Sequence, residues 1–301
     1  MLKMIKVKLM RSLGRLLIAY KWRGKVPRDL VVTNETMPVD GGAIGVRIYT
    51  PRGRGPFPVL HFFHGGGWVG GDLETHDALC RDLCIQSQHL VVAFDYRLAP
   101  EHPFPIPIND CLASLAWIKA NAARLSGDVD RIVLCGDSAG GNLVAVSAQQ
   151  ARSRHPGLIK GQVLIYPVTD HCGFANWSSY RTHGGSKFNL THAGMTELWA
   201  FYLTDSPLWV PGATSHELAT PLHVEDLRDL PPAFFVIADE DLLRDEAAEY
   251  GRRMELAGNR VRIKHYPGQQ HGFVGLEPSP AHKEAVADVA QWLKTLTTAD
   301  A

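Results

Sequence analysis

The stretch Gly136-Asp137-Ser138-Ala139-Gly140 contains a serine that could act as a nucleophile. It fits the pattern G-x-S-x-G, and it stands between an apolar run that predicts a strand and a segment that predicts a helix. A serine on so sharp a turn leaves no room for side chains two residues away on either side, which explains both glycines. The following helix would also direct N–H groups towards negative charge forming at the hydroxyl. The stretch therefore predicts an exposed nucleophile, Ser138, rather than a turn with an incidental serine.

A second stretch, "HFFHGGGWVGG", places Gly65, Gly66 and Gly67 directly after an apolar run. Attack of a serine on a carbonyl forms an oxyanion, which needs preorganised hydrogen-bond donors. One donor would be the N–H of Ala139, and others must come from a loop whose backbone can approach the substrate. The spacing G-x-x-x-x-G-K-[ST], which is typical of phosphate-binding loops, is absent here. The glycines therefore predict an oxyanion-binding loop.

A serine nucleophile needs a base, and the base needs an orienting carboxylate. In a fold with a G-x-S-x-G turn the order along the chain is Ser, Asp or Glu, His. His271 lies in the glycine-bearing segment "PGQQHGF", directly after an apolar run. His265 falls inside a predicted strand and His282 at a helix start, where ordinary structural roles suffice. His271 is the predicted base.

The orienting carboxylate is expected in "DEDLLRDE", which follows the apolar run at 234–238. Asp241 is the favoured residue. Asp239, Glu240 and Asp245 compete with it, although Asp245 is expected inside the following helix. Spacing alone reduces the number of candidate carboxylates but does not identify the acid.

Strand-like runs alternate with helical patterns from about residue 43 onwards. The predicted strands lie at 43–50, 59–63, 90–94, 132–134, 163–166, 234–238 and 261–266. The predicted helices lie at about 77–86, 109–121, 139–152, 243–257 and 282–297. The later strands are continuous apolar runs, as in a parallel sheet that is covered on both faces. This alternation predicts an α/β fold with a doubly wound sheet flanked by helices.

The segment from about residue 169 to 222 interrupts this alternation. It predicts no strand, but "LTHAGMTELWAFYL" has a helical pattern. We expect this insertion and the N-terminus to form a lid over the carboxyl edge of the sheet, where α/β folds bind ligands. Five residues could wall an apolar pocket there or simply form the core of the lid: Trp68, Phe201, Tyr202, Leu208 and Trp209.

The first 25 residues predict an amphipathic helix. Its longest purely apolar run, 16–20, is too short for a signal peptide or a membrane span. The favoured interpretation is that an apolar stripe at helical spacing docks on the body of the protein. The alternative is that this basic helix lies on a membrane surface. The stripe consists of Ile5, Leu9, Leu13, Leu16 and Tyr20.

The composition restricts the possible partners. Thirty-one basic residues balance 31 acidic ones, which gives no electrostatic reason to expect a nucleic-acid partner. The five cysteines are odd in number and form no CxxC pair, which indicates free thiols in a reducing compartment, and we expect a cytoplasmic protein. No obvious set of metal ligands surrounds them.

Together these residues resemble the hormone-sensitive-lipase-like family of α/β-hydrolase esterases, also called bacterial family IV. "HGGGW" at 64–68 and "GDSAGG" at 136–141 match two of its motifs, and "DYRLAPEHPFP" at 95–105 resembles a third. "DEDLLRDE" matches the family's D-P-L-R-D segment, with Leu242 where proline is usual, and this alignment places the acid at Asp241. "HGF" from His271 completes the set, so the similarity covers about residues 40–300.

The resemblance implies an α/β-hydrolase fold with a mostly parallel central sheet and a helical cap. The implied cap comprises residues 1–40 and 170–222, and the implied catalytic core comprises 41–169 and 223–301. The oxyanion donors would be the N–H groups of Gly66, Gly67 and Ala139. His64 and Gly65 would support the loop through hydrogen bonds rather than take part in the chemistry.

The implied function is that of a serine carboxylesterase for short- to medium-chain esters, acting through a Ser-His-Asp triad and an acyl-enzyme. No metal or organic cofactor is expected, and a homodimer is possible by analogy with the family. An amide hydrolase, such as a deacetylase or formamidase, would use the same triad. A non-catalytic ligand-binding protein on the same scaffold is a further alternative, against which the presence of His271 argues.

Overall fold

The computed structural model describes residues 2–171, 177–209, 213 and 215–297 of the 301-residue chain. Eight strands form a single sheet in the order β1-β2-β4-β3-β5-β6-β7-β8. The strands are β1 (Leu30–Val39), β2 (Gly42–Pro51), β3 (Phe57–Phe63), β4 (Leu90–Asp95), β5 (Gly127–Asp137), β6 (Ile159–Ile165), β7 (Ala233–Glu240) and β8 (Val261–Gln270).

Six neighbouring strands, β4-β3-β5-β6-β7-β8, run parallel, and β1 and β2 form an antiparallel extension at one edge. The carboxyl ends of the six parallel strands therefore lie along one edge of the sheet. Loops that follow different strands can meet there, even when they are far apart in the sequence.

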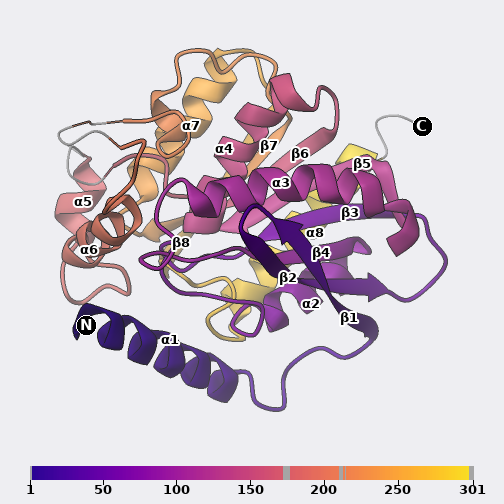
Figure 1. Ribbon diagram of the computed structural model, residues 1–301, viewed down its shortest axis with the longest axis horizontal. Helices are drawn as coiled ribbons and strands as arrows, with labels where there is room; N and C mark the ends of the chain where they lie inside the picture. The colour runs from indigo at the N-terminus through magenta and orange to yellow at the C-terminus, as the bar shows by residue number, and fades with distance from the viewer. Residues whose placement is uncertain (1, 172–176, 210–212, 214, 298–301) are drawn as a thin grey trace.

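Helices cover both faces of the sheet, as the continuous apolar strands predict (Figure 1). One face carries α3 (Ile106–Asn121), α4 (Ala139–Arg154) and α7 (Arg244–Leu256). The other carries α2 (Asp77–Ser87) and α8 (Pro280–Thr297), which pack against each other. A hydrophobic core fills each interface. This architecture is the predicted α/β-hydrolase fold.

β3 illustrates why its sequence shows no apolar-polar alternation. Val59 and Phe63 belong to the core beneath α3 and α4, while Leu60 and Phe62 belong to the core beneath α2 and α8. Successive side chains of a strand point to opposite faces, so both sets must be apolar when both faces are covered.

β1 is an element that the sequence-based strand assignment omits. Its polar and partly exposed sequence, "LVVTNETMPV", forms the outermost strand, which pairs with β2 alone. The sheet therefore begins at Leu30, inside the range 1–40 that was assigned to the cap. The division of the chain into cap and core remains a prediction. The insertion contains α5 (Ser178–His183) and α6 (His192–Leu203), and residues 172–176, 210–212 and 214 lie outside the described part.

The N-terminal helix α1 (Leu2–Lys21) lies along the lower edge of the molecule in Figure 1. The expectation that its apolar stripe docks on the body is wrong. All five stripe residues are between 56% and 75% exposed. The opposite side of the helix faces the body, where Val7 is buried and Arg11 and Arg15 form ion pairs with Glu101 and Asp72.

Two further expectations concern the cysteines and the membrane. Four cysteines, Cys80, Cys84, Cys111 and Cys135, are free and buried, and the fifth, Cys172, lies outside the described residues. Within the described ranges, no helix combines the length and the apolar character that crossing a bilayer requires.

Candidate active site

Ser138 stands on a strained turn between β5 and α4. Its backbone adopts φ 55° and ψ −119°, which side-chain-bearing residues rarely adopt. The two flanking glycines are sterically required. A Cβ on Gly136 would come within 2.5 Å of the carbonyl oxygen of Gly140, and a Cβ on Gly140 would overlap the carbonyl oxygen of Phe63. The turn thus presents the hydroxyl at the carboxyl edge of the sheet.

The residues predicted as nucleophile, base and acid lie in one hydrogen-bonded chain. The Nε2 atom of His271 lies 2.9 Å from the Oγ atom of Ser138, and its Nδ1 atom lies 2.6 Å from Oδ2 of Asp241. The side chain of Asp241 is buried, and its other carboxylate oxygen accepts the N–H of Leu243. Both partners of the serine follow parallel strands, Asp241 after β7 and His271 after β8. Such a chain of contacts can transfer a proton from a hydroxyl to an imidazole.

The predicted oxyanion loop follows β3 and faces the same place. Gly66 and Gly67 have φ values of +117° and +63°, a region that glycine adopts without strain. Both line one cavity with Ser138. No acceptor among the described residues takes their N–H groups. Ala139 is the first residue of α4, so its N–H has no partner within the helix.

His64 is fully buried beside this loop. Its Nδ1 atom lies 2.8 Å from the carbonyl oxygen of Gly65, and its ring stacks on Tyr96 with 4.3 Å between the ring centroids. The hydroxyl of Tyr96 donates to the carbonyl oxygen of His64 at 2.7 Å. Burial lowers the pKa of His64 to about 4, so the ring is neutral at pH 7. These contacts fit a supporting role for His64.

A second histidine beside the nucleophile, His76, was not identified from the sequence. Its Nε2 atom lies 3.2 Å from Oδ1 of Asp137, the residue before Ser138, and the N–H of Gly65 donates to the same oxygen at 2.9 Å. Burial alone would raise the pKa of Asp137, but His76 and the N–H of Gly65 outweigh it, so this pKa is lowered. Burial likewise disfavours a charged His76, but Asp137 outweighs it and raises the pKa of His76. The pair joins the oxyanion loop to the nucleophile turn.

A cavity of about 500 Å³ opens beside Ser138 and His271. Its walls come from α1, the glycine loop, α6 and the segment after β8. Most of the apolar side chains that line it belong to segments with no family motif, namely Met10, Ile18, Leu190, Leu198, Val274 and Leu276. Leu198 lies directly over Gly67, since a Cβ on that glycine would overlap its side chain.

None of the five residues predicted as a pocket wall lines this cavity. Trp68 and Tyr202 are instead fully buried and stack with 4.3 Å between centroids, and Trp199 packs against Trp68. Phe201 and Trp209 also pack against the core, and Leu208 is exposed. Apart from Leu208, their packing corresponds to the interpretation in which these residues form a core rather than a pocket wall.

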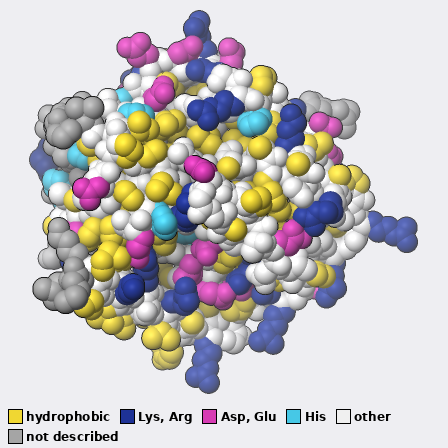
Figure 2. All heavy atoms as spheres, in the orientation of Figure 1, with side chains coloured by type: hydrophobic (Ala, Val, Ile, Leu, Met, Phe, Trp, Pro, Cys, Tyr) yellow, Lys and Arg dark blue, Asp and Glu magenta, His cyan; other side chains and the backbone are white. Residues whose placement is uncertain are grey.

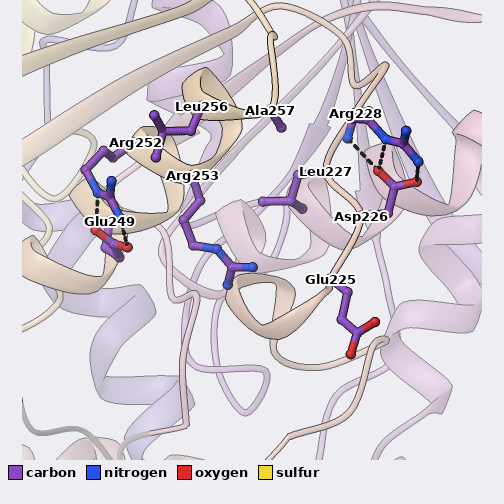
Figure 3. A pocket seen from close by; sticks show the side chains of 9 residues that line it. All are labelled: Glu225, Asp226, Leu227, Arg228, Glu249, Arg252, Arg253, Leu256 and Ala257. Carbon is purple, nitrogen blue, oxygen red and sulfur yellow. Dashed lines mark hydrogen bonds and ion pairs between the residues drawn. The ribbon is translucent and has the colours of Figure 1, made fainter.

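A second hollow, of about 600 Å³, lies between α7 and the segment that precedes β7. Figure 3 shows two of its three arginines beside acidic neighbours, Arg252 beside Glu249 and Arg228 beside Asp226. It contains no serine, cysteine or histidine, and two of its three arginines are held in ion pairs. This hollow offers no chemistry for acyl transfer.

No group of three or more histidine, cysteine or acidic residues that could hold a metal ion occurs in the part of the chain that the structure describes.

Comparison with known proteins identifies the family. Residues 60–275 match the family model of the α/β-hydrolase fold. The carboxylic ester hydrolase LipN of Mycobacterium tuberculosis is 39% identical over 81% of this chain, which spans 65% of LipN's length. The carboxylesterase NlhH of the same species is 39% identical over 82% of this chain and 76% of its own.

Solved structures agree with these relatives. A hyperthermophilic esterase from the archaeon Pyrobaculum calidifontis superimposes with a TM-score of 0.88 at 35% identity, covering 97% of this chain and 94% of its own. The thermostable carboxylesterase EstE1, cloned from a metagenomic library, gives a TM-score of 0.88 at 37% identity over 96% of this chain and 95% of its own. The chain therefore belongs to the α/β-hydrolase fold family. Within that family it is a member of the hormone-sensitive-lipase-like carboxylic ester hydrolases.

Proposed function

We propose that the protein is a carboxylesterase that hydrolyses short- to medium-chain esters at Ser138, with His271 as the base and Asp241 as the orienting acid. The observation that carries this proposal is the continuous chain of contacts from Ser138 Oγ through the imidazole to Asp241, 2.9 Å and 2.6 Å long. Family membership supports the ester as the substrate class.

Acylation follows from this geometry. Nε2 of His271 accepts the proton of Ser138 while Oγ attacks the ester carbonyl carbon. The carbonyl oxygen becomes an oxyanion and accepts hydrogen bonds from the N–H groups of Gly66, Gly67 and Ala139. Asp241 holds Nδ1 protonated, which directs the basic nitrogen towards the serine and stabilises the imidazolium. The imidazolium then protonates the leaving alcohol.

Deacylation reverses these roles with water in place of the alcohol. His271 removes a proton from water, which attacks the acyl-enzyme carbonyl through a second oxyanion. The imidazolium returns the proton to Ser138 Oγ, and the carboxylic acid leaves. The same donors serve both steps.

The cavity supports an ester of modest size. Its volume of about 500 Å³ lies in the range of sites for small organic ligands, and apolar side chains form most of its walls. Such walls favour an aliphatic chain over a charged substituent.

The nucleophile is tested by Ser138→Ala, which should lower kcat for p-nitrophenyl butyrate by roughly 10⁶-fold if the triad acts as a unit. An organophosphonate should label the unmodified enzyme at Ser138 and leave this variant unlabelled. Ser153→Ala, on the outer part of α4, is the matched control and should retain full activity. Near wild-type hydrolysis by Ser138→Ala would contradict the proposal.

The substrate class is tested with p-nitrophenyl acetate, butyrate, octanoate and palmitate, together with p-nitroanilides of the same acids. We expect the highest kcat/KM between acetate and octanoate. A maximum at palmitate would identify a long-chain lipase, and comparable rates on anilides would favour an amide hydrolase.

A further inference from the structure

The outward side of α1 is a continuous apolar surface. Its residues Ile5, Leu9, Leu13, Leu16 and Tyr20 recur every three or four positions and therefore share one side of the helix. The opposite side, which includes Val7, Arg11 and Ile18, contacts the body or lines the cavity. The apolar stripe consequently points away from the protein.

This concentration of exposed apolar side chains is specific to α1. Of the eleven exposed large hydrophobic residues among those the structure describes, seven lie on this helix. The other four, Val31, Leu208, Leu256 and Leu276, are distributed over separate elements. Hydrophobic side chains accompany basic ones along the lower edge of the molecule, where α1 lies (Figure 2). A contiguous patch, unlike scattered residues, indicates a surface that binds something.

The charge of α1 is entirely positive. The helix contains six lysines and arginines and no acidic residue. Four of the six are anchored to the body, as Lys6, Arg11, Arg15 and Lys21 form ion pairs with Glu197, Glu101, Asp72 and Glu277. Lys8 is exposed and has no acidic partner among the described residues, and Arg23 and Lys25 are exposed just beyond the helix. The apolar stripe is therefore bordered by cations.

Charge complementarity distinguishes between the possible occupants. A second copy of the chain that docked through a two-fold axis would place the remaining cations beside the stripe near their own copies, with no acidic residue of α1 to compensate them. An anionic lipid surface satisfies both features at once, because it accepts the apolar side chains at the acyl boundary and attracts lysine and arginine at the headgroups. We propose that the outward side of α1 docks on an anionic lipid surface.

The location of α1 connects this docking to the cavity. The helix that carries the lipid-facing stripe also supplies Met10, Gly14 and Ile18 to the cavity walls. Docking would place α1, which forms part of the wall of this cavity, against the lipid surface. The docking itself goes beyond the proposed ester hydrolysis and does not depend on it.

Vesicle flotation tests the docking directly. The full chain is mixed with vesicles of phosphatidylcholine alone or with about 30 mol% phosphatidylglycerol. We expect binding to the anionic vesicles that is weakened severalfold when salt is raised from about 0.05 M to 0.5 M, because the shorter Debye length screens the cations. Binding equal on both vesicle types at all salt concentrations would overturn the proposal.

The double variant Leu9→Gln, Leu16→Gln tests the stripe itself. The two leucines would be buried in the lipid on docking, so replacing them should weaken partitioning of the protein to vesicles at least about tenfold. The matched control is Leu256→Gln on α7, which is 72% exposed but lies outside α1, and it should bind like the unmodified chain. Both variants should retain the melting temperature and the activity on p-nitrophenyl acetate, because neither site packs in the core or lines the cavity.

Two outcomes would overturn the proposal and remain distinct from a failure of the proposed function. The first is flotation of the double variant with unchanged affinity. The second is no flotation of the unmodified chain, together with a dimer in light scattering that the double variant abolishes, which would assign the stripe to self-association. Tyr20→Trp with brominated lipids is a further readout that keeps the stripe apolar, and its fluorescence should be quenched on docking.

Discussion

At the scale of single residues, two Asp–His pairs lie near the carboxyl ends of β7 and β8. Asp241 and His271 are 2.6 Å apart, and Asp239 and His265 are 2.7 Å apart. Their surroundings differ: the side chains of the first pair are 1% and 13% exposed, and those of the second are 32% and 47% exposed. Of these two histidines, only His271 also contacts a serine hydroxyl. The first pair is therefore suited to orient a base, whereas the second is an exposed surface contact of small energetic weight.

The two pairs provide a matched test of the acid. Asp241→Asn should lower kcat/KM for p-nitrophenyl butyrate by roughly 10⁴-fold, because the amide favours the wrong imidazole tautomer while preserving the shape of the site. Asp239→Asn should change the same constant by less than about threefold. Steady-state kinetics on both purified variants decide the matter, and equal losses would contradict the assignment of Asp241.

Local spacing could not choose among these carboxylates for a physical reason. The pairing of β7 with β8 shifts register between Ala238 and Glu240, so strand alternation does not show which following side chain turns towards Ser138. Asp245, which lies inside α7 as expected, accepts the N–H of Ser179 on α5. The family motif identified Asp241 because the motif aligns the whole segment "DEDLLRDE" and not a single carboxylate. The serine and the histidine needed less help, since each has a glycine-rich flank at a strand end.

At the scale of elements, Asp137 joins three segments that hold the nucleophile and the glycine loop together. It ends β5, accepts the N–H of Gly65 from the loop after β3, and pairs with His76 at the start of α2. A Cβ on Gly65 would overlap this carboxylate, so the loop can approach only as glycine. The pair thus fixes the distance between the two halves of the predicted oxyanion site.

The raised pKa of His76 determines how this junction depends on pH. Because its folded-state pKa lies above the ordinary value of 6.5, its stabilising charge is fully present below pH 6.5 and is lost as the pH rises through the raised value. The pKa of Asp137 lies below 3.8, so its contribution is present above pH 3.8 and is lost as the pH falls through the lowered value. The pair stabilises the fold most between these limits.

His76→Ala should lower the free energy of unfolding by about 3–5 kcal/mol near pH 6, because it leaves a buried carboxylate without its partner. The difference from the unmodified chain should shrink as the pH rises above 6.5. Urea denaturation across pH 5–9 measures it, with the surface variant His265→Ala as the control, expected to change stability by less than about 1 kcal/mol. A difference that stays constant across this range would exclude a charged His76.

Helices and strands of the core were predictable because each has a one-sided or two-sided apolar pattern. The two elements that the sequence analysis missed or oriented wrongly, β1 and α1, lack such a pattern on the side that packs. β1 contains Thr33, Asn34 and Glu35 in its middle because an outermost strand has exposed positions. The periodicity of α1 revealed its stripe correctly but could not show which side packs, since ion pairs to Glu101 and Asp72 hold the charged side inward.

At the scale of the whole molecule, the cavity is assembled from segments that are remote in the sequence. Residues of α1 meet Leu198 of α6 and Leu276 after β8 around Ser138. Asn189 donates from its side chain to the carbonyl oxygen of His271, so the insertion contacts the predicted base directly. No motif marks these walls, which is why the chemistry was predictable from the sequence and the cavity lining was not. The aromatic residues Trp199 and Tyr202 of the insertion pack against each other and against Trp68 instead of lining the cavity.

Ile18 and its neighbour Leu17 allow the wall contributed by α1 to be tested. Ile18 lines the cavity, whereas Leu17 is exposed outside it. Ile18→Trp should fill part of the cavity and raise KM for p-nitrophenyl octanoate about tenfold or more, because excluding even one or two methylenes from an apolar pocket is worth about 1–3 kcal/mol. The KM for acetate should change by less than about threefold, since a two-carbon acyl group stays near Ser138.

Leu17→Trp adds the same bulk one position away and should leave both constants unchanged. Equal effects of Ile18→Trp on both esters, or the same selectivity in both variants, would mean that α1 does not bound the space that the acyl chain occupies.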